Sequence, residues 1–318
     1  MADFDNRNII IALAGATASG KTALGVELAL ALGGEVISCD SMQVYRGMGI
    51  ACATPTASEM KGVPHHLVNY VDPCEEYSVA RFCSDATEAV TDIFARGKVP
   101  LLVGGTGLYM QSFTDNITFA GGGASEYREK LSARVETEGA QCLLHELSEI
   151  DPEYAAKLHV NDIKRIVRAL EMYYSSGIRM SDQLAQSRSI APSFDTVRLA
   201  IGYRDREVLY SRINKRVDIM LENGLLEEAR EAYVRRGVTS AQAIGHKELF
   251  AFFDGTATQA ECAERLKMQT RRYAKRQLSW FRRDGRFHWL YADGKDLSEL
   301  TNEALDYIEE ETCLERHI

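Results

Sequence analysis

Residues Gly15–Thr22 read GATASGKT and lie between the apolar run Ile9–Ala14 and a helical pattern that starts at Lys21. Strand, loop and helix in this order are what a phosphate-binding loop requires. Glycines allow backbone conformations closed to other residues, so successive N–H groups can turn inward around an anion. The N-terminus of the following helix adds positive potential at the same point. The stretch therefore predicts a site for a phosphate or diphosphate, without saying which molecule carries it.

Two side chains of this loop have assignable chemistry. Lys21 is expected to contact phosphate oxygens, and the Thr22 hydroxyl is placed to ligate Mg²⁺. The competing interpretation is an ordinary glycine-rich turn. The residues predicted to bind diphosphate are Gly15, Ala16, Thr17, Ala18, Ser19, Gly20, Lys21 and Thr22.

Composition narrows the class of protein. A chain of 318 residues, 45% of them hydrophobic, exceeds one compact domain and can bury a large core. Its seven cysteines are scattered and form no C-x-x-C pair, which argues against a disulfide framework or a zinc site. No apolar run approaches the roughly 20 residues of a membrane span, and the N-terminus does not resemble a signal peptide. We expect a soluble cytoplasmic protein that does not bind membranes.

Strands and helices alternate through the first third of the chain. The predicted elements are strand Ile9–Ala14, helix Lys21–Leu32, strand Glu35–Cys39, helix Val79–Arg96 and strand Val99–Val103. Short apolar strands separated by helices indicate a parallel sheet covered on both faces, with ligands at the carboxyl ends of the strands. Gly15, Asp40 and Gly104 each follow a strand, so they should line one crevice.

The pattern changes near Asn116. A glycine run, Gly121–Gly123, predicts a flexible break, and strand character returns only at Thr196–Gly202. The predicted helices between them are Ser125–Gly139, Ala140–Glu149 and Asp162–Ser176. The expected fold is therefore α/β, a P-loop-containing parallel sheet flanked by helices. Its core would comprise 1–116 and 195–318, and a helical insertion domain would comprise 117–194.

The formal net charge of −9 hides a strongly basic segment, Arg265–Arg286. On a helical wheel its cations gather on one side, opposite Leu266 and Trp280. So many positive charges repel one another unless an anion such as RNA approaches, although a solvated helix face is the alternative. The clustered cations are Arg265, Arg271, Arg272, Lys275, Arg276, Arg282 and Arg283.

Other polar residues have less specific signals. Asp40, just after the second strand, could accept a proton from a substrate or cap a helix. Thr106, within GGTGLY, lies where backbone could approach a ligand closely, or in a plain strand-to-helix turn. An ATPase or GTPase carries an acidic residue at the end of a later strand, but the strand before Thr106 ends in glycine. This weakens the interpretation of the protein as an ATPase or a GTPase. For His65-His66 we prefer a structural or substrate-contact role to a metal site.

Eight blocks in order resemble bacterial tRNA dimethylallyltransferases. The resemblance covers roughly 9–289, and it departs at Ala16, where the family usually has proline, a change that removes no N–H donor. The blocks are GATASGKT, DSMQVYRGM, GVPHHL, VGGTGLYM, DIKRIVRALEMY, LYSRINKRVDIML, AIGHKEL and TRRYAKRQLSWFRR.

The resemblance implies transfer of a dimethylallyl group from dimethylallyl diphosphate to the exocyclic amine of the adenine 3′ to the anticodon in tRNA. Asp40 would be the catalytic acceptor of the amine proton, Lys21 and Thr106 would assist, and Arg216 would clamp the diphosphate. The adenine would be flipped out of the anticodon loop, which the helical insertion would grip. The alternatives are a P-loop small-molecule kinase, a free adenine-nucleotide prenyltransferase and, least favoured, a non-catalytic RNA-binding module.

The resemblance also implies the partners. The anticodon stem-loop of tRNA would be the macromolecular substrate, and Mg²⁺ would be the cofactor. We expect the chain to act as a monomer. The positions expected to contact tRNA are Asp40, Ser41, Met42, Gln43, Thr106, Arg128, Lys164, Arg165, Ile166, Val167, Arg168, Gln242, Ala243, Ile244, Gly245, His246, Lys247, Glu248 and Leu249.

Overall fold

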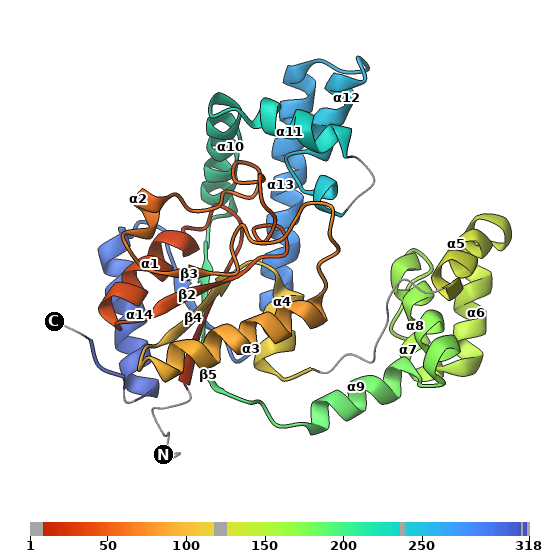
Figure 1. Ribbon diagram of the computed structural model, residues 1–318, viewed down its shortest axis with the longest axis horizontal. Helices are drawn as coiled ribbons and strands as arrows, with labels where there is room; N and C mark the ends of the chain where they lie inside the picture. Colours follow the sequence, from red (N-terminus) through yellow and green to blue (C-terminus); the bar gives the residue numbers. More distant parts are fainter. Residues whose placement is uncertain (1–8, 118–125, 236–238, 313, 317–318) are drawn as a thin grey trace. The chain divides into compact units, whose positions relative to one another are not determined.

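The computed structural model describes residues 9–117, 126–235, 239–312 and 314–316. The chain forms two compact units (Figure 1). The core unit comprises residues 1–113 and 194–318, and the insertion unit comprises residues 114–193. The predicted glycine break, Gly121–Gly123, lies outside the described residues.

A single sheet of six parallel strands organises the core unit, in the order β3-β2-β4-β1-β5-β6. This confirms the predicted parallel α/β sheet. The sequence did not predict the two outer strands, β3 and β6. They contain only two and four residues, which is too short for a recognisable periodic pattern. The strands are β1 (Ile9–Gly15), β2 (Glu35–Cys39), β3 (His65–His66), β4 (Pro100–Gly104), β5 (Asp195–Gly202) and β6 (His288–Tyr291).

Both faces of the central strand β1 are buried, as its continuous apolar sequence requires. Ile11 and Leu13 pack into one cluster together with α1 (Lys21–Ala31) and α14 (Leu297–Glu311). Ile10 and Ala12 pack into the opposite cluster with α3 (Val79–Ala95) and α4 (Gly107–Thr114). The core unit is thus a sheet between two helical layers.

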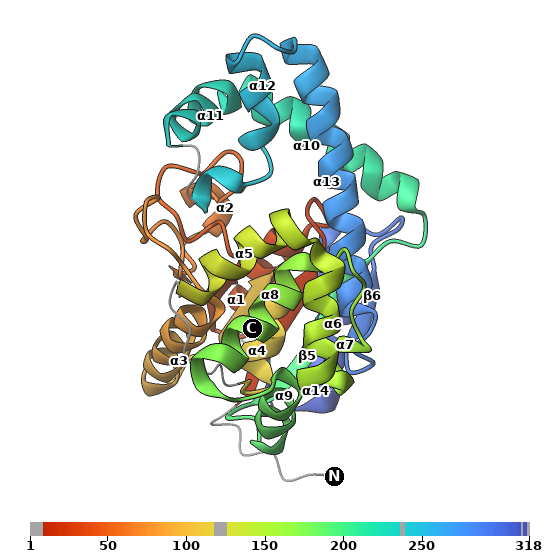
Figure 2. The same ribbon diagram turned by 90° about the vertical axis from the view of Figure 1, so that its right-hand side faces the viewer.

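Further helices stand together at one end of the core unit (Figures 1 and 2). They share a small core that includes Val217, Leu225, Leu249 and Leu266. These elements are α10 (Arg206–Glu222), α11 (Leu225–Val234), α12 (Phe250–Phe253) and α13 (Gln259–Phe281). A separate short helix of the core unit is α2 (Ala57–Met60).

The basic segment does form a helix, but α13 is displaced toward the N-terminus relative to the sequence prediction. A capping box starts it before Arg265: the Thr258 side chain accepts the backbone N–H of Glu261, whose carboxylate accepts that of Thr258. The helix ends at Phe281, so Arg282–Arg286 lies beyond it.

The insertion unit is entirely helical in its described residues. Its core contains Leu131, Leu143, Leu147, Ile166 and Leu170. The described helices are α5 (Glu126–Glu138), α6 (Ala140–Ile150), α7 (Pro152–Ala155), α8 (Ile163–Ser176) and α9 (Met180–Ser189). Whether this unit grips an anticodon stem-loop stays a prediction.

Helix α13 also packs tightly on the first residue of α4. A Cβ on Gly107 would lie 2.3 Å from the Trp280 Cδ1 atom, whereas a Cβ on Gly285 would meet nothing within 4 Å. Gly107→Ala is therefore expected to lower the free energy of unfolding by about 1–3 kcal/mol. Gly285→Ala should change it by less than about 0.5 kcal/mol. Urea unfolding of both variants measures the difference, and equal stabilities would contradict this close packing.

Candidate active site

The phosphate loop is held open by side chains from distant parts of the chain. Ala18 and Gly20 adopt left-handed conformations, with φ of 62° and 99°. The Arg212 Nε atom donates to the Ala18 carbonyl at 2.9 Å, and the Tyr203 hydroxyl donates to the Ser19 carbonyl at 3.1 Å. Since C=O and N–H point in opposite directions across a trans peptide, a tethered Ser19 carbonyl turns the Gly20 N–H the other way. The loop is therefore arranged to present N–H groups to an anion.

A cavity of about 920 Å³ opens beside this loop. Lys21, Thr22, Arg212, Lys215 and Arg216 line it, and its other walls are largely apolar. Its size suits a small-molecule ligand. Sequence reasoning named only Arg216 of the cations on α10, although the spacing of 212, 215 and 216 on one helix face could have indicated the other two.

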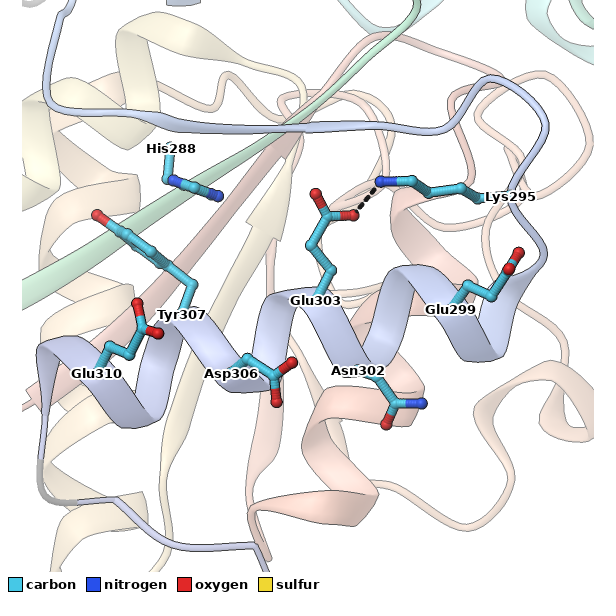
Figure 3. A pocket seen from close by; sticks show the side chains of 8 residues that line it. All are labelled: His288, Lys295, Glu299, Asn302, Glu303, Asp306, Tyr307 and Glu310. Carbon is cyan, nitrogen blue, oxygen red and sulfur yellow. Dashed lines mark hydrogen bonds and ion pairs between the residues drawn. The ribbon is translucent and has the colours of Figure 1, made fainter.

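A second hollow, about 630 Å³, lies on α14 and has the opposite character (Figure 3). It is lined by Glu299, Glu303, Asp306 and Glu310, and its one lysine, Lys295, forms an ion pair with Glu303. Negative potential of this kind repels phosphate groups. The cavity at the phosphate loop is therefore the candidate anion site.

Charges in the candidate site act on one another. Burial, together with the neighbouring Arg216, lowers the pKa of Lys21 to about 8, and Asp40 opposes this shift. Burial also lowers the pKa of Arg216, again opposed by Asp40. Burial thus disfavours both cations more than Asp40 favours them, and an incoming diphosphate would add the negative charge that offsets this.

Asp40 meets the phosphate loop at the carboxyl edge of the sheet. It lines a small cavity together with Lys21, Thr22 and Gly104, as expected of residues that follow parallel strands. Its Oδ1 atom accepts the Met42 N–H at 2.9 Å, which closes a turn. The alternative of a helix cap is wrong, because no helix begins between Asp40 and the start of α2 at Ala57.

Thr106 supports the segment that carries Asp40. Its Oγ1 atom accepts the Ser41 N–H at 3.1 Å, and its own N–H donates to the Cys39 carbonyl at 3.2 Å. The ends of β2 and β4 are thereby joined at the candidate site.

The glycines before Thr106 lie against protein on the side where a Cβ would project, which fits the strand-to-helix turn that the sequence left open as an alternative to close approach of a ligand. A Cβ on Gly104 would lie 2.0 Å from the Cys39 carbonyl oxygen, and one on Gly105 would lie 2.2 Å from the Gln277 Nε2 atom. Gln277 was missed from the sequence, because a single glutamine in a basic helix carries no recognisable signal.

The histidine pair divides its roles. The Nε2 atom of His66 lies 2.7 Å from Glu35, which also binds Arg96, so His66 is structural. His65 borders the small cavity that contains Asp40. In the part of the chain that the structure describes, no group of three or more His, Cys, Asp or Glu residues could hold a metal ion.

The segment 242–249 mostly faces the interior. His246 is buried, and its Nε2 atom lies 2.8 Å from Glu228. The Glu228 carboxylate accepts the N–H groups of Ile50 at 2.8 Å and Ala51 at 2.9 Å. This arrangement supports one wall of the large cavity, to which Ile50 belongs. Of the positions in this segment expected to contact tRNA, Gln242 and Lys247 are exposed and Ile244 is partly exposed. The others are buried and present almost no side-chain surface: Ala243, Gly245, His246, Glu248 and Leu249.

The predicted contacts of the insertion unit also need revision. Lys164 and Arg165 are exposed, but Ile166 and Val167 are buried in its core and cannot touch RNA through their side chains. Arg128 and Arg168 each place a nitrogen 2.9 Å from Glu171, whose side chain is only 1% exposed. We infer that this carboxylate orients both guanidinium groups, which stay partly exposed.

The basic face of α13 is exposed in the core unit. Arg265, Arg272, Lys275 and Arg276 are all exposed, and Leu266 and Phe281 on the other side are buried. Tyr273 and Trp280 are only partly covered. The predicted separation of charged and apolar sides is confirmed.

Comparison with known proteins identifies the family. The IPP transferase family model matches residues 43–284, and an isopentenyl transferase model matches residues 8–70. The chain belongs to the IPP transferase family. A tRNA dimethylallyltransferase of Geobacillus thermodenitrificans is 43% identical over 97% of this chain and 99% of its own length. The Bacillus subtilis enzyme of that name is 44% identical over 88% of this chain and 90% of its own length.

Solved structures agree with this membership. The tRNA isopentenylpyrophosphate transferase of Bacillus halodurans matches with a TM-score of 0.70 at 43% identity, over 96% of this chain and 98% of that one. A eukaryotic dimethylallyltransferase acting on tRNA matches with a TM-score of 0.80 at 33% identity, over 95% of this chain and 80% of that one. Among the described residues of this family member, no helix is both long and apolar enough to cross a bilayer.

The lowered pKa of Lys21 predicts how anion binding depends on pH. Below about 8 the ammonium is charged and attracts phosphate oxygens, and above that pH it loses its proton. The dissociation constant of an alkyl diphosphate should therefore rise as the pH increases from 7 to 9, by up to about tenfold per pH unit above the pKa. Isothermal titration calorimetry measures this constant. Lys21→Met should bind more weakly at pH 7 and lack this dependence; a variant that keeps the wild-type pH profile would contradict the assignment.

Proposed function

We propose that this protein transfers the dimethylallyl group of dimethylallyl diphosphate to the exocyclic amine of the adenine 3′ to the anticodon in tRNA, releasing diphosphate. Membership of the IPP transferase family supports the reaction class. The observation that carries the proposal is the juxtaposition of Asp40 with Lys21 and Thr22 around one cavity. A proton acceptor beside an anion site is what transfer from a diphosphate to an amine needs.

The anion half of the reaction belongs to the phosphate loop and α10. As the bond between the allylic carbon and the diphosphate oxygen breaks, negative charge grows on the leaving diphosphate. Lys21 and Arg216, which line the large cavity, and the N–H groups of the phosphate loop would stabilise that charge.

The Thr22 hydroxyl supplies an oxygen donor that suits Mg²⁺, and it lines the small cavity. When bound there, Mg²⁺ would neutralise charge on the diphosphate. This ion is part of the proposal.

The acceptor half belongs to Asp40 and its supports. The carboxylate would hydrogen-bond the attacking amine and take a proton as the new carbon–nitrogen bond forms. Thr106 holds the adjoining Ser41 N–H, so it fixes the direction of the Asp40 segment. An adenine inside a stacked loop cannot reach this point, and the base must therefore be flipped out.

Two surfaces offer positive charge to RNA phosphates. In the core unit these are the exposed cations of α13, and in the insertion unit they are Lys164 and Arg165 at the start of α8. Such contacts weaken steeply with salt. We further propose that the protein acts as a monomer. Its location would be the cytoplasm, where it meets its tRNA substrate.

The kinase alternative is less well supported by the residues present. The strand β4 ends at Gly104 and continues into Gly105 and Thr106, with no acid to position Mg²⁺ and water. Free adenine nucleotides would make little use of the exposed basic face of α13.

Transfer of label tests the reaction directly. With Mg²⁺ and radiolabelled dimethylallyl diphosphate, label should enter an unmodified anticodon stem-loop with an adenine 3′ to the anticodon. A stem-loop with guanine at that position should remain unlabelled, as should AMP. Label in AMP would favour a free-nucleotide prenyltransferase, and phosphoryl transfer from ATP to a metabolite would favour a kinase.

Asp40→Asn separates catalysis from folding. Asparagine keeps the oxygen that accepts the Met42 N–H but cannot take a proton at neutral pH. We expect kcat to fall about 100- to 10,000-fold, with stem-loop affinity nearly unchanged. Single-turnover kinetics and filter binding measure the two quantities. A parallel loss of both would show that Asp40 is structural rather than catalytic.

A further inference from the structure

Gln277 connects two loops that are far apart in the sequence. Its side chain belongs to α13, and the residue is only 5% exposed. The Oε1 atom accepts the Thr17 N–H at 2.9 Å, and the Nε2 atom donates to the Gly105 carbonyl at 2.9 Å. Both ends of the amide are thus satisfied by backbone groups, one in the phosphate loop and one in the loop after β4.

The connection leaves little room for adjustment. A Cβ on Gly105 would lie 2.2 Å from the Gln277 Nε2 atom, and a Cβ on Gly107 would lie 2.3 Å from Trp280 Cδ1, one turn further along α13. The helix therefore lies directly against the loop that carries Thr106. Close-packed groups of this kind transmit displacements instead of absorbing them.

The two loops carry the two halves of the proposed reaction. Thr17 lies within the loop that binds diphosphate, while Gly105 precedes Thr106, which holds the Ser41 N–H beside Asp40. Gln277 also takes up the Thr17 N–H, so that group is not available to the anion. The amide thus links the phosphate loop to the loop that supports the proposed proton acceptor, without lining either cavity.

We propose that Gln277 is a positioning residue, whose amide sets the separation between the phosphate loop and the Thr106–Asp40 segment. This inference rests on the proposed function, because the separation matters only if the allylic carbon and the attacking amine must meet between these loops. Displacing reacting groups by about 1 Å can cost about 100-fold in rate.

Gln277→Met tests the proposal, since methionine has nearly the same length but makes neither hydrogen bond. We expect kcat to fall about 10- to 100-fold while KM for the stem-loop changes less than about threefold. Gln277→Glu keeps an acceptor for Thr17 but sets a carboxylate oxygen against the Gly105 carbonyl, so it should lose at least as much. The matched control is Gln259→Met, at the exposed start of the same helix, which should behave as wild type.

Three results would overturn the proposal. One is an unchanged kcat in folded Gln277→Met. Another concerns the fraction of the Gln277→Met protein that binds inorganic diphosphate, which calorimetry measures. If the activity per binding-competent molecule equals that of the wild type, Gln277 acts through folding alone and is merely structural. The third needs no variant: in the wild-type protein, the Thr17 amide should exchange with solvent at least about tenfold more slowly than an unprotected loop amide, and fast exchange would remove the hydrogen bond on which the proposal stands.

Failure of the proposed function would look different. A wild-type protein that labels no RNA contradicts that function, while diphosphate binding and Thr17 exchange still report on the Gln277 connection.

Discussion

The hydrogen bonds that hold the phosphate loop determine the geometry of the whole candidate site. Ala18 and Gly20 adopt left-handed conformations, and Ala18, as an alanine, is there at a steric cost. Arg212, Tyr203 and Gln277 tether the loop from α10, from the end of β5 and from α13. Because these partners come from the second half of the core unit, the anion site exists only once the chain on both sides of the insertion has folded together.

The candidate site contains two groups of opposite charge, the cations of the phosphate loop and α10 and the carboxylate of Asp40. Cations on the phosphate loop and α10 are partly desolvated, and burial lowers the pKa of both Lys21 and Arg216. Asp40 is close enough to oppose both shifts, so its carboxylate and the cations stabilise one another before substrate arrives. A diphosphate would take over the partnership with the cations, which leaves Asp40 to interact with an amine.

Helix α13 serves both the surface and the site. Its exposed side carries cations suited to RNA phosphates, and its other side carries Gln277 and Trp280 against the phosphate loop and the segment after β4. The glycines at 105 and 107 are required by this packing, because any side chain there would collide with the helix. Glu228 and His246 act similarly at the far wall of the cavity, where they hold the backbone of Ile50 and Ala51.

Local sequence determined the parts of this protein whose physics is local. The phosphate loop follows from glycine and lysine spacing, strands β1, β2, β4 and β5 from apolar runs, and the two-sided character of α13 from helical periodicity. Asp40 could be placed beside Gly104 because parallel strands end at one edge. Tertiary structure alone decided the partners of these groups: Gln277 with Thr17, Glu228 with Ile50, and Glu171 with Arg128. It also buried Ile166 and His246, which the motif blocks had suggested as RNA contacts. Such pairings depend on distances across the folded chain, and no periodicity or spacing within a short segment encodes them.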